Sequence, residues 1–509
     1  VGSVRCVIRD RDKVTIYVDA GFPILLIHSY EEKKIDEIIK KSAAGRELYE
    51  WNGVTGFTDF STKKSYNLMD CSLQGTLKYL VNGDELQGRI VVLKDVHSLM
   101  DEPEIIAIIK NIALRISTGE LDTNIIIVSS SKYIPQELEP YTSVLEMDYL
   151  KTDEIKKIIQ EVISDNNLNQ VQNDLLDEMA ISFKGLSQFE IENILALAVN
   201  EDNGELTKRS LKFIFEQKRQ RIIKSGILDM IPPKETIEDI GGLDNLKKWL
   251  TKKAKVFKNI DKAQKFGVDT PKGVLIAGVP GCGKSLNAKA AAALFEVPLL
   301  RLDMGRIMGK YVGESEANMR KAIALAEAIA PCVVWIDELE KGLAGIGGDN
   351  GGSDVTTRLF GSLLTWMQEK ESAAFVVATA NDITKLPPEL LRKGRFDEIF
   401  YVGLPNAEER KKIFQIHISK RRKSNAELRN IDFDILVSRT SGYSGADIEG
   451  IVKESIENVY VDEKKELTTN DILETIRHTH SLSEIMKEPL KKMSEEYENR
   501  KLKNASEER

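Results

Sequence analysis

The sequence predicts an α/β fold in which a parallel sheet lies between helices, and three apolar runs with polar ends predict it. Residues 273–277 precede the loop Gly278-Val279-Pro280-Gly281-Cys282-Gly283-Lys284-Ser285, after which residues 286–293 favour a helix. A second run, 332–336, ends in Asp337-Glu338, and a third, 375–380, ends in Asn381. An apolar strand, a glycine loop and a helix in this order are the context of a phosphate-binding loop.

The glycine loop has the residues that hold a polyphosphate. Its glycines let backbone N–H groups wrap the phosphates at a helix N-terminus, where the helix dipole favours negative charge. Lys284 would reach the β- and γ-phosphates of ATP, and Ser285 would hold Mg²⁺. We therefore expect the loop, together with Leu286, to bind the nucleotide.

The polar residues that follow the other two runs have the types needed for hydrolysis. Asp337 would coordinate Mg²⁺, and Glu338 would orient and deprotonate the attacking water. Asn381 would hold that water against the γ-phosphate. Arg392 and Arg395, three residues apart, suit arginine fingers that act on the γ-phosphate of a neighbouring subunit. The alternative for either arginine is a surface ion pair.

Residues 237–480 resemble an AAA ATPase module. The resemblance rests on residues 237–243, both nucleotide motifs, Asn381, residues 391–397 and residues 442–447. It implies a P-loop AAA+ fold with a helical lid and a Mg²⁺-dependent ATPase. In that family Gly242, Gly445 and Ala446 flank the nucleotide. His417 matches a lid histidine near the nucleotide, but a packed helix histidine is an equal alternative.

The resemblance also indicates a pore loop at residues 310–316. There Tyr311 and Val312 would face the axial channel of a homo-oligomeric, hexameric ring. An exposed aromatic residue on such a loop can grip any extended chain by apolar contact. The alternative is that Tyr311 packs beneath its loop. The glycine-rich residues 342–352 would form a second pore-side loop or a surface excursion.

The first half of the chain repeats landmarks of the second half without its chemistry. Residues 24–28, 90–95, 134–138 and 185–194 precede similar segments by nearly constant offsets. Ser29-Tyr30-Glu31-Glu32 stands where the glycine loop should be, and its two acids would repel phosphate. Val96 stands at the position of Glu338. We therefore predict a degenerate AAA-like domain that cannot hydrolyse ATP and serves as a ring scaffold or docking surface.

These observations predict five segments. They are a degenerate ATPase-like domain at 1–224, a linker at 225–242, an AAA+ nucleotide-binding domain at 243–403, a helical lid at 404–480 and a charged helical tail at 481–509. This arrangement, with the tail residues 489–494, resembles the AAA family named as a hypothetical chloroplast reading frame, found in plastids, cyanobacteria and other bacteria.

Composition favours a globular protein and disfavours several partners. The 509 residues are 42% hydrophobic and 30% charged, as in ordinary soluble proteins. No apolar stretch approaches the roughly 18 residues of a membrane helix. The four cysteines form no C-x-x-C pair, which argues for a reducing compartment and against a zinc site. We expect a cytoplasmic protein, or a stromal one if it is plastid-encoded.

Two functions remain open beyond ATP hydrolysis. In the first, the ring threads or remodels an unknown protein substrate, with Tyr311 as the grip. In the second, ATP sets the assembly state of a regulatory scaffold. A nucleic-acid motor is less favoured, because the net charge is −8.

The lysine-rich residues 247–265 suit the solvated face of an amphipathic helix, with Leu246, Leu250, Phe257 and Ile260 on its apolar side.

Overall fold

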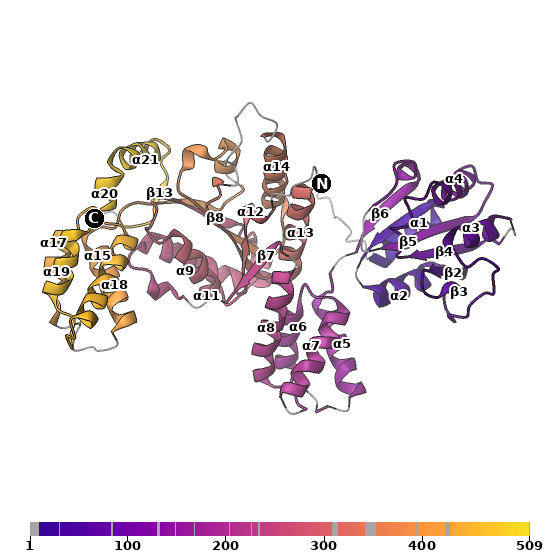
Figure 1. Cartoon of the computed structure of the whole chain (residues 1–509), viewed down its shortest axis with the longest axis horizontal. Helices are drawn as coiled ribbons and strands as arrows, with labels where there is room; N and C mark the ends of the chain where they lie inside the picture. Colours follow the sequence, from indigo (N-terminus) through magenta and orange to yellow (C-terminus); the bar gives the residue numbers. More distant parts are fainter. Residues whose placement is uncertain are drawn as a thin grey trace. The chain divides into compact units, whose positions relative to one another are not determined.

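The computed structural model describes residues 10–29, 31–82, 85–129, 133–147, 149–166, 168–169, 171–202, 204–224, 226–232, 235–307, 314–341, 353–392, 394–422, 428 and 430–507. The chain divides into two compact units, Val1–Leu206 and Thr207–Arg509. Each unit is built on its own sheet (Figure 1).

The first unit contains a six-stranded sheet with the order β3-β2-β4-β5-β1-β6. Its strands are β1 (Ile24–His28), β2 (Glu47–Asn52), β3 (Gly56–Asp59), β4 (Arg89–Lys94), β5 (Thr123–Ser129) and β6 (Thr142–Glu146). Every neighbouring pair is parallel except β2 and β3. The apolar runs in β1, β4 and β5 do not alternate with polar residues, which is typical of a parallel sheet covered on both faces.

Helices cover both faces of this sheet (Figure 1). Helices α1 (Asp10–Asp19) and α2 (Glu32–Ser42) pack on one face, and α3 (Leu73–Asn82) and α4 (Pro103–Ser117) pack on the other. Three further helices follow along the chain, namely α5 (Thr152–Asp165), α6 (Asn173–Phe183) and α7 (Gln188–Glu201). Helix α7 begins at a capping box between Ser187 and Glu190, the usual signature of a helix start.

The second unit contains a seven-stranded sheet with the order β13-β12-β8-β11-β10-β9-β7. Its strands are β7 (Leu228–Ile231), β8 (Gly273–Gly278), β9 (Leu299–Leu302), β10 (Cys332–Ile336), β11 (Ala374–Ala380), β12 (Glu398–Val402) and β13 (Lys503–Asn504). Only β7 runs antiparallel to its neighbour. Helices α9 (Asp244–Phe257) and α11 (Lys284–Phe295) cover one face, and α13 (Glu314–Ile329) and α14 (Ser353–Glu369) cover the other.

The two sheets have the same strand order. The series β6-β1-β5-β4-β2 in the first unit matches β12-β8-β11-β10-β9 in the second, and an antiparallel strand follows at the same end of each. The two units therefore share one sheet topology, in agreement with the repeat that the sequence predicts. Val96 is fully buried in the core of the first unit.

The segment predicted as a linker carries regular structure. It contains β7, which pairs with β9, and the short helix η2 (Ile237–Asp239). Helix α8 (Lys208–Lys224) packs against β7 and belongs to the second unit. Along the chain, the boundary between the units therefore falls after Leu206, before the predicted boundary at residue 224. The amphipathic helix predicted near residue 247 corresponds to α9 and α10 (Ile260–Lys265), whose apolar side chains pack in the core.

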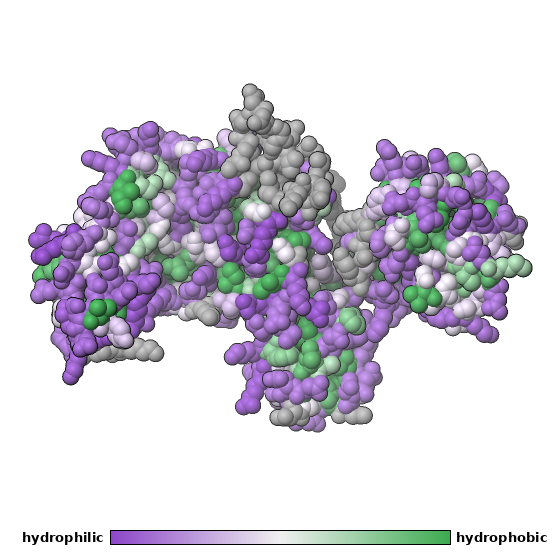
Figure 2. Space-filling model, in the orientation of Figure 1, coloured by the Kyte–Doolittle hydropathy of each residue, from purple (hydrophilic) through white to green (hydrophobic). Residues whose placement is uncertain are grey.

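The lid consists of α15 (Ala407–Arg421), α17 (Phe433–Arg439), α18 (Gly445–Val461) and α19 (Thr469–His478) around a core of their own. The C-terminal tail continues as α20 (Leu482–Ile485) and α21 (Lys487–Asn499) and ends in β13. Hydrophilic side chains dominate the visible face of both units (Figure 2). Among the helices in the described ranges, none has the length and apolar character required to cross a membrane.

Candidate nucleotide-binding site

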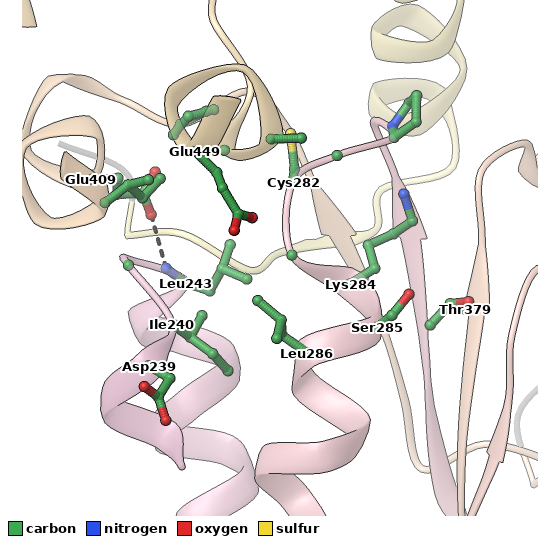
Figure 3. A pocket seen from close by; sticks show the side chains of 18 of the residues that line it. Asp239, Ile240, Leu243, Cys282, Lys284, Ser285, Leu286, Thr379, Glu409 and Glu449 are labelled. Carbon is green, nitrogen blue, oxygen red and sulfur yellow. Dashed lines mark hydrogen bonds between the residues drawn. The ribbon is translucent and has the colours of Figure 1, made fainter. Parts of the chain in front are cut away.

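A cavity of about 300 Å³ lies where β8 ends in the second unit. It brings together the predicted residues Pro280, Gly281, Cys282, Gly283, Lys284, Ser285, Leu286, Asp337, Glu338, Asn381, His417, Gly445 and Ala446. Figure 3 shows the apolar side chains of Ile240, Leu243 and Leu286 on one side of the cavity, and Lys284 and Ser285 on another. The cavity therefore has an apolar part and a polar part.

The glycine loop wraps around the ammonium of Lys284. The Nζ of Lys284 donates to the carbonyl oxygens of Gly278 and Val279, at 2.9 and 2.8 Å. These two residues therefore contact the lysine and do not line the cavity. Burial lowers the pKa of Lys284 to about 8, because a desolvated ammonium loses hydration. A phosphate in the cavity would offer Lys284 a stronger acceptor than either carbonyl.

Glycine is required at the start of the loop because the backbone of another strand passes very close. Gly278 has φ of 146°, and a Cβ there would lie 2.1 Å from the carbonyl oxygen of Val402 in β12. Val279 donates its N–H to the same carbonyl at 2.9 Å. The position of the loop is thus tied to the end of β12.

A hydroxyl–carboxylate cluster lies beside the first turn of α11. Ser285 Oγ donates to Asp337 Oδ1 at 3.0 Å, and Thr379 Oγ1 donates to the same oxygen at 2.6 Å. A carboxylate and a serine hydroxyl at this spacing are oxygen ligands of the kind that Mg²⁺ takes beside a nucleotide. The residues present therefore fit a magnesium ion held by Ser285 and Asp337.

The side chains of Glu338 and Asn381 contact each other. Asn381 Nδ2 donates to Glu338 Oε1 at 3.0 Å, and Lys341 forms an ion pair with Glu338. Glu338 has φ of 49°, an uncommon region for a side-chain-bearing residue. Its N–H donates to Thr379 Oγ1 at 2.9 Å. Thr379 therefore supports both Asp337 and the backbone of Glu338.

The lid reaches the cavity through the start of α18. Ala446 donates its N–H to the carbonyl of Gly281 at 2.9 Å. His417 also lines the cavity, and its Nδ1 lies 3.8 Å from Glu449 Oε1. Burial lowers the pKa of His417, so the ring is neutral at physiological pH. Figure 3 shows the Glu449 carboxylate directed toward the space between Leu243 and Cys282.

Gly242 does not line the cavity but leaves room for a buried carboxylate. A Cβ on Gly242, at φ of 84°, would lie 2.3 Å from Glu409 Oε1. That oxygen accepts the N–H of Leu243 at 2.9 Å (Figure 3). Oε2 of Glu409 accepts the N–H of Asn406 at 3.0 Å. Glu409 therefore joins the lid to the loop that forms the apolar wall.

The remaining predicted residues do not line this cavity. Arg392 is exposed, whereas Arg395 is half-buried, and its Nε has no hydrogen-bond partner in the described part of the chain. Their predicted role requires a neighbouring subunit. Tyr311, Val312 and residues 342–352 lie outside the described residues.

In the first unit, the segment that follows β1 corresponds to the glycine loop, and a glutamate side chain from this segment contacts the start of a helix. Both carboxylate oxygens of Glu31 accept the N–H of Gln188, the first residue of α7, at 2.9 Å. Burial raises the pKa of Glu31. The N-terminus of a helix favours an anion, and here Glu31 supplies it. In the second unit, the start of α18 faces the cavity instead.

Comparisons with known proteins agree with this architecture. Residues 274–404 match the ATPase family associated with various cellular activities (AAA), and residues 430–474 match the AAA+ lid domain. Residues 10–147 and 153–225 match the N-terminal and second domains of SpoVK-like AAA ATPases. An AAA domain-containing protein ycf46 from Pyropia yezoensis is 36% identical over 96% of this chain and 98% of its own length. The chain belongs to this AAA ATPase family.

Two further relatives have the same name. The ycf46 protein of Guillardia theta is 36% identical over 92% of this chain and 91% of its own length. That of Trieres chinensis is 33% identical over 93% of this chain and 94% of its own length. The resemblance therefore extends through both units of the chain.

Sequence reasoning missed three supporting side chains of the AAA module. Thr379 lies two residues before Asn381, and the period of two along a strand puts both on one face. Glu409 lies three residues after Asn406, which is a capping-box spacing. Glu340 follows Glu338 by two residues and accepts the N–H of Asn381 at 2.9 Å. The first two had a local signal, whereas the contact of Glu340 depends on the neighbouring strand.

Proposed function

We propose that the second unit binds ATP with Mg²⁺ and hydrolyses the bond to the γ-phosphate. The observation that carries this proposal is the pairing of two side-chain sets beside the glycine loop. Ser285 Oγ lies 3.0 Å from Asp337 Oδ1, and Asn381 Nδ2 lies 3.0 Å from Glu338 Oε1. The first pair supplies oxygen ligands, and the second supplies a base with an amide that orients water.

In the proposed reaction, Lys284 exchanges its two carbonyl acceptors for phosphate oxygens. Ser285 and Asp337 would hold Mg²⁺, which neutralises charge on the phosphates when bound. Glu338 accepts a proton from the attacking water, and Asn381 orients that water. The water oxygen bonds to the γ-phosphorus as the bond to ADP breaks. Because Glu338 contacts Lys341 and Asn381, its carboxylate has to turn toward the water before this step.

The direct test compares ATP binding and turnover in the wild type and in Lys284→Ala. The variant should lose most nucleotide affinity, because the phosphate loses its cation. Lys321→Ala, at an exposed position on α13, is the matched control and should behave as the wild type. Unchanged affinity and turnover in Lys284→Ala would contradict the proposal.

We further propose that Arg392 and Arg395 act on the γ-phosphate of a neighbouring subunit in a hexameric ring. Their absence from the cavity lining supports a role in trans. A finger of this kind contributes roughly 10³- to 10⁵-fold in rate. Mixing Arg395→Ala subunits with Lys284→Ala subunits should restore turnover at mixed interfaces, where one subunit supplies the loop and its neighbour the arginine. Full turnover by a wild-type monomer, independent of protein concentration, would exclude this arrangement.

For the work that ATP drives, we propose the threading or remodelling of a protein substrate, with Tyr311 gripping the chain. Tyr311→Ala should then keep basal turnover within a few fold and lose stimulation by an unfolded polypeptide such as casein. A regulatory scaffold is the second candidate. The contact of Glu31 with the start of α7 favours this candidate, because the Glu31 carboxylate takes the position at this helix N-terminus that a phosphate could occupy. For a scaffold, Tyr311→Ala would leave partner binding unchanged, and deletion of residues 1–206 would abolish it.

A further inference from the structure

Glu449 brings a carboxylate into the nucleotide cavity from the lid. It lies on α18 and lines the cavity together with Leu243, Cys282 and His417. Figure 3 shows its carboxylate directed toward the space between Leu243, on the apolar wall, and Cys282, in the glycine loop. The hydrolysis proposed above does not use this side chain. A carboxylate at this place is unexpected in a cavity for a polyphosphate, because like charges repel.

The two ends of the cavity fix where each part of a bound nucleotide would lie. Lys284 and Ser285 mark the phosphate end, because they suit the β- and γ-phosphates and Mg²⁺. Ile240 and Leu243 mark the apolar end, which suits a flat base. In a nucleoside triphosphate, the ribose lies between the base and the phosphates. The Glu449 carboxylate, which points between Leu243 and the glycine loop, therefore faces the position of the ribose.

The Glu449 carboxylate has one oxygen held by the protein and one left for a ligand. Arg421 Nη2 donates to Oε1 at 2.8 Å. Within the described ranges, no donor contacts Oε2, and the side chain is 50% exposed. An ionised carboxylate only accepts hydrogen bonds, and the two hydroxyls of a ribose are donors. Oε2 can thus accept from a ribose hydroxyl while Oε1 stays bound to Arg421.

Arg421 supplies the charge that makes a carboxylate tolerable beside phosphates. It lies one turn after His417 on α15, and its Nη1 donates to the carbonyl of His417 at 3.3 Å. The hydrogen bond from Arg421 lowers the pKa of Glu449, so the carboxylate stays ionised at neutral pH. The pair carries no net charge. Arg421 therefore orients the acceptor and limits its repulsion of the nucleotide.

We propose that Glu449 is a specificity-determining residue that accepts a hydrogen bond from a ribose hydroxyl of the nucleotide, and that Arg421 is its positioning residue. The site then prefers ribonucleotides to deoxyribonucleotides. This inference rests on the proposed function, because it requires a nucleoside triphosphate in the cavity.

The first arm of the test measures the Kd of the full-length protein for ATP, 2′-deoxy-ATP and 3′-deoxy-ATP by calorimetry with Mg²⁺. The wild type should bind ATP roughly tenfold more tightly than at least one deoxy analogue, which lacks the hydrogen bond to a charged acceptor. In Glu449→Ala, ATP should weaken to the affinity of that analogue. The analogue itself should bind at least as tightly as to the wild type, because the charge of Arg421 is no longer offset. Glu457→Ala, exposed on the same helix, is the matched control and should keep the wild-type preference.

The second arm tests the charge and the positioning of the acceptor. Glu449→Gln keeps the size of the side chain and an acceptor oxygen, but a neutral acceptor makes a weaker hydrogen bond. Its preference for ATP should lie between those of the wild type and Glu449→Ala, and it carries the comparison if melting temperatures show that Glu449→Ala fails to fold. Arg421→Ala should narrow the ribose preference and weaken all three nucleotides, because the carboxylate loses both its fixed orientation and its counter-charge. Arg439→Ala, exposed on α17, is the control for Arg421.

A third arm distinguishes the ribose from the base, since the exocyclic amino group of adenine is also a donor. ITP carries an oxygen in place of that amino group. The ratio of the affinities for ATP and ITP should be the same in the wild type and in Glu449→Ala. If Glu449→Ala removed a preference for ATP over ITP and left the ribose preference intact, the carboxylate would contact the base, and the proposal would be wrong.

The outcomes separate the inference from the proposed function. No binding of ATP by the wild type would overturn the proposed function and this inference with it. Binding of ATP and both deoxy analogues with equal affinity would overturn only this inference. An equal loss of affinity for all three nucleotides in Glu449→Ala would indicate a structural role in the lid and contradict the inference. An unchanged ribose preference in Arg421→Ala would overturn the positioning role of Arg421.

Discussion

Thr379 donates its hydroxyl to Asp337 Oδ1 at 2.6 Å while the same hydroxyl accepts the backbone N–H of Glu338 at 2.9 Å. One side chain on β11 therefore orients the carboxylate proposed to hold Mg²⁺ and supports the positive φ of the proposed base. This relationship joins the two residues that directly follow β10 to the neighbouring strand β11.

Thr379→Val should weaken both functions of this hydroxyl while conserving the shape of the side chain. Loss of a residue that orients a metal ligand typically costs about 10- to 100-fold in metal affinity or activity. We expect the Mg²⁺ concentration for half-maximal turnover to rise within that range. Thr365→Val, exposed on α14, is the control. A magnesium titration identical to that of the wild type would exclude the role of Thr379.

Nucleotide affinity should depend on pH through Lys284. Burial lowers its pKa to about 8 in the free protein, and a bound phosphate would raise that pKa by favouring the ammonium. Binding should therefore be strongest below pH 8 and weaken up to about tenfold for each pH unit above it, until the pKa of the complex is reached. Calorimetry at pH 8.5 in buffers of different ionisation enthalpy should detect proton uptake on binding. No proton uptake would contradict this prediction.

Gly242→Ala should destabilise the protein and weaken nucleotide binding. An alanine Cβ would meet the buried carboxylate of Glu409, which holds the N–H of Leu243. Gly267 is a matched control, because it has φ of 92° but nothing within 4 Å of its added Cβ. Both alanine variants should lose about 1 kcal/mol from backbone strain, and only Gly242→Ala should also lose affinity. Equal affinities in the two variants would refute the packing explanation.

Glu31→Ala should loosen α7 in the first unit without creating a nucleotide site. The carboxylate accepts the N–H of Gln188, and the loss of such a contact at a helix terminus typically costs about 1 kcal/mol. Hydrogen exchange at the start of α7 should therefore become faster. Glu37→Ala, exposed on α2, should leave it unchanged. Protection equal to that of the wild type would show that Glu31 does not stabilise the helix start.

The sequence predicted the features that depend on short segments. The glycine loop, the acids after β10 and Asn381 after β11 are recognisable because each follows an apolar run of strand length. Features that depend on distant residues were missed or placed differently. Strand β7 pairs with β9 although its segment contains Pro232 and was predicted as a linker.

The tail illustrates the same limit. Its charged residues predict a helix, but the position of that helix on the sheet depends on Tyr401. The ring of Tyr401 stacks on that of Tyr497, which lies nearly one hundred residues later in the sequence. Helical periodicity cannot identify such a partner. Glu340 was missed for the same reason, since its acceptor role appears only when β10 and β11 lie side by side.

The most direct test of ATP hydrolysis in the second unit is a single-turnover measurement with full-length Glu338→Gln. Glutamine keeps the shape and the contact with Asn381 but cannot accept the proton of the attacking water. The account predicts that ATP binds with near wild-type affinity and that cleavage slows by about 10²- to 10⁴-fold, so that intact ATP remains on the protein. Cleavage by Glu338→Gln at the wild-type rate would contradict the account.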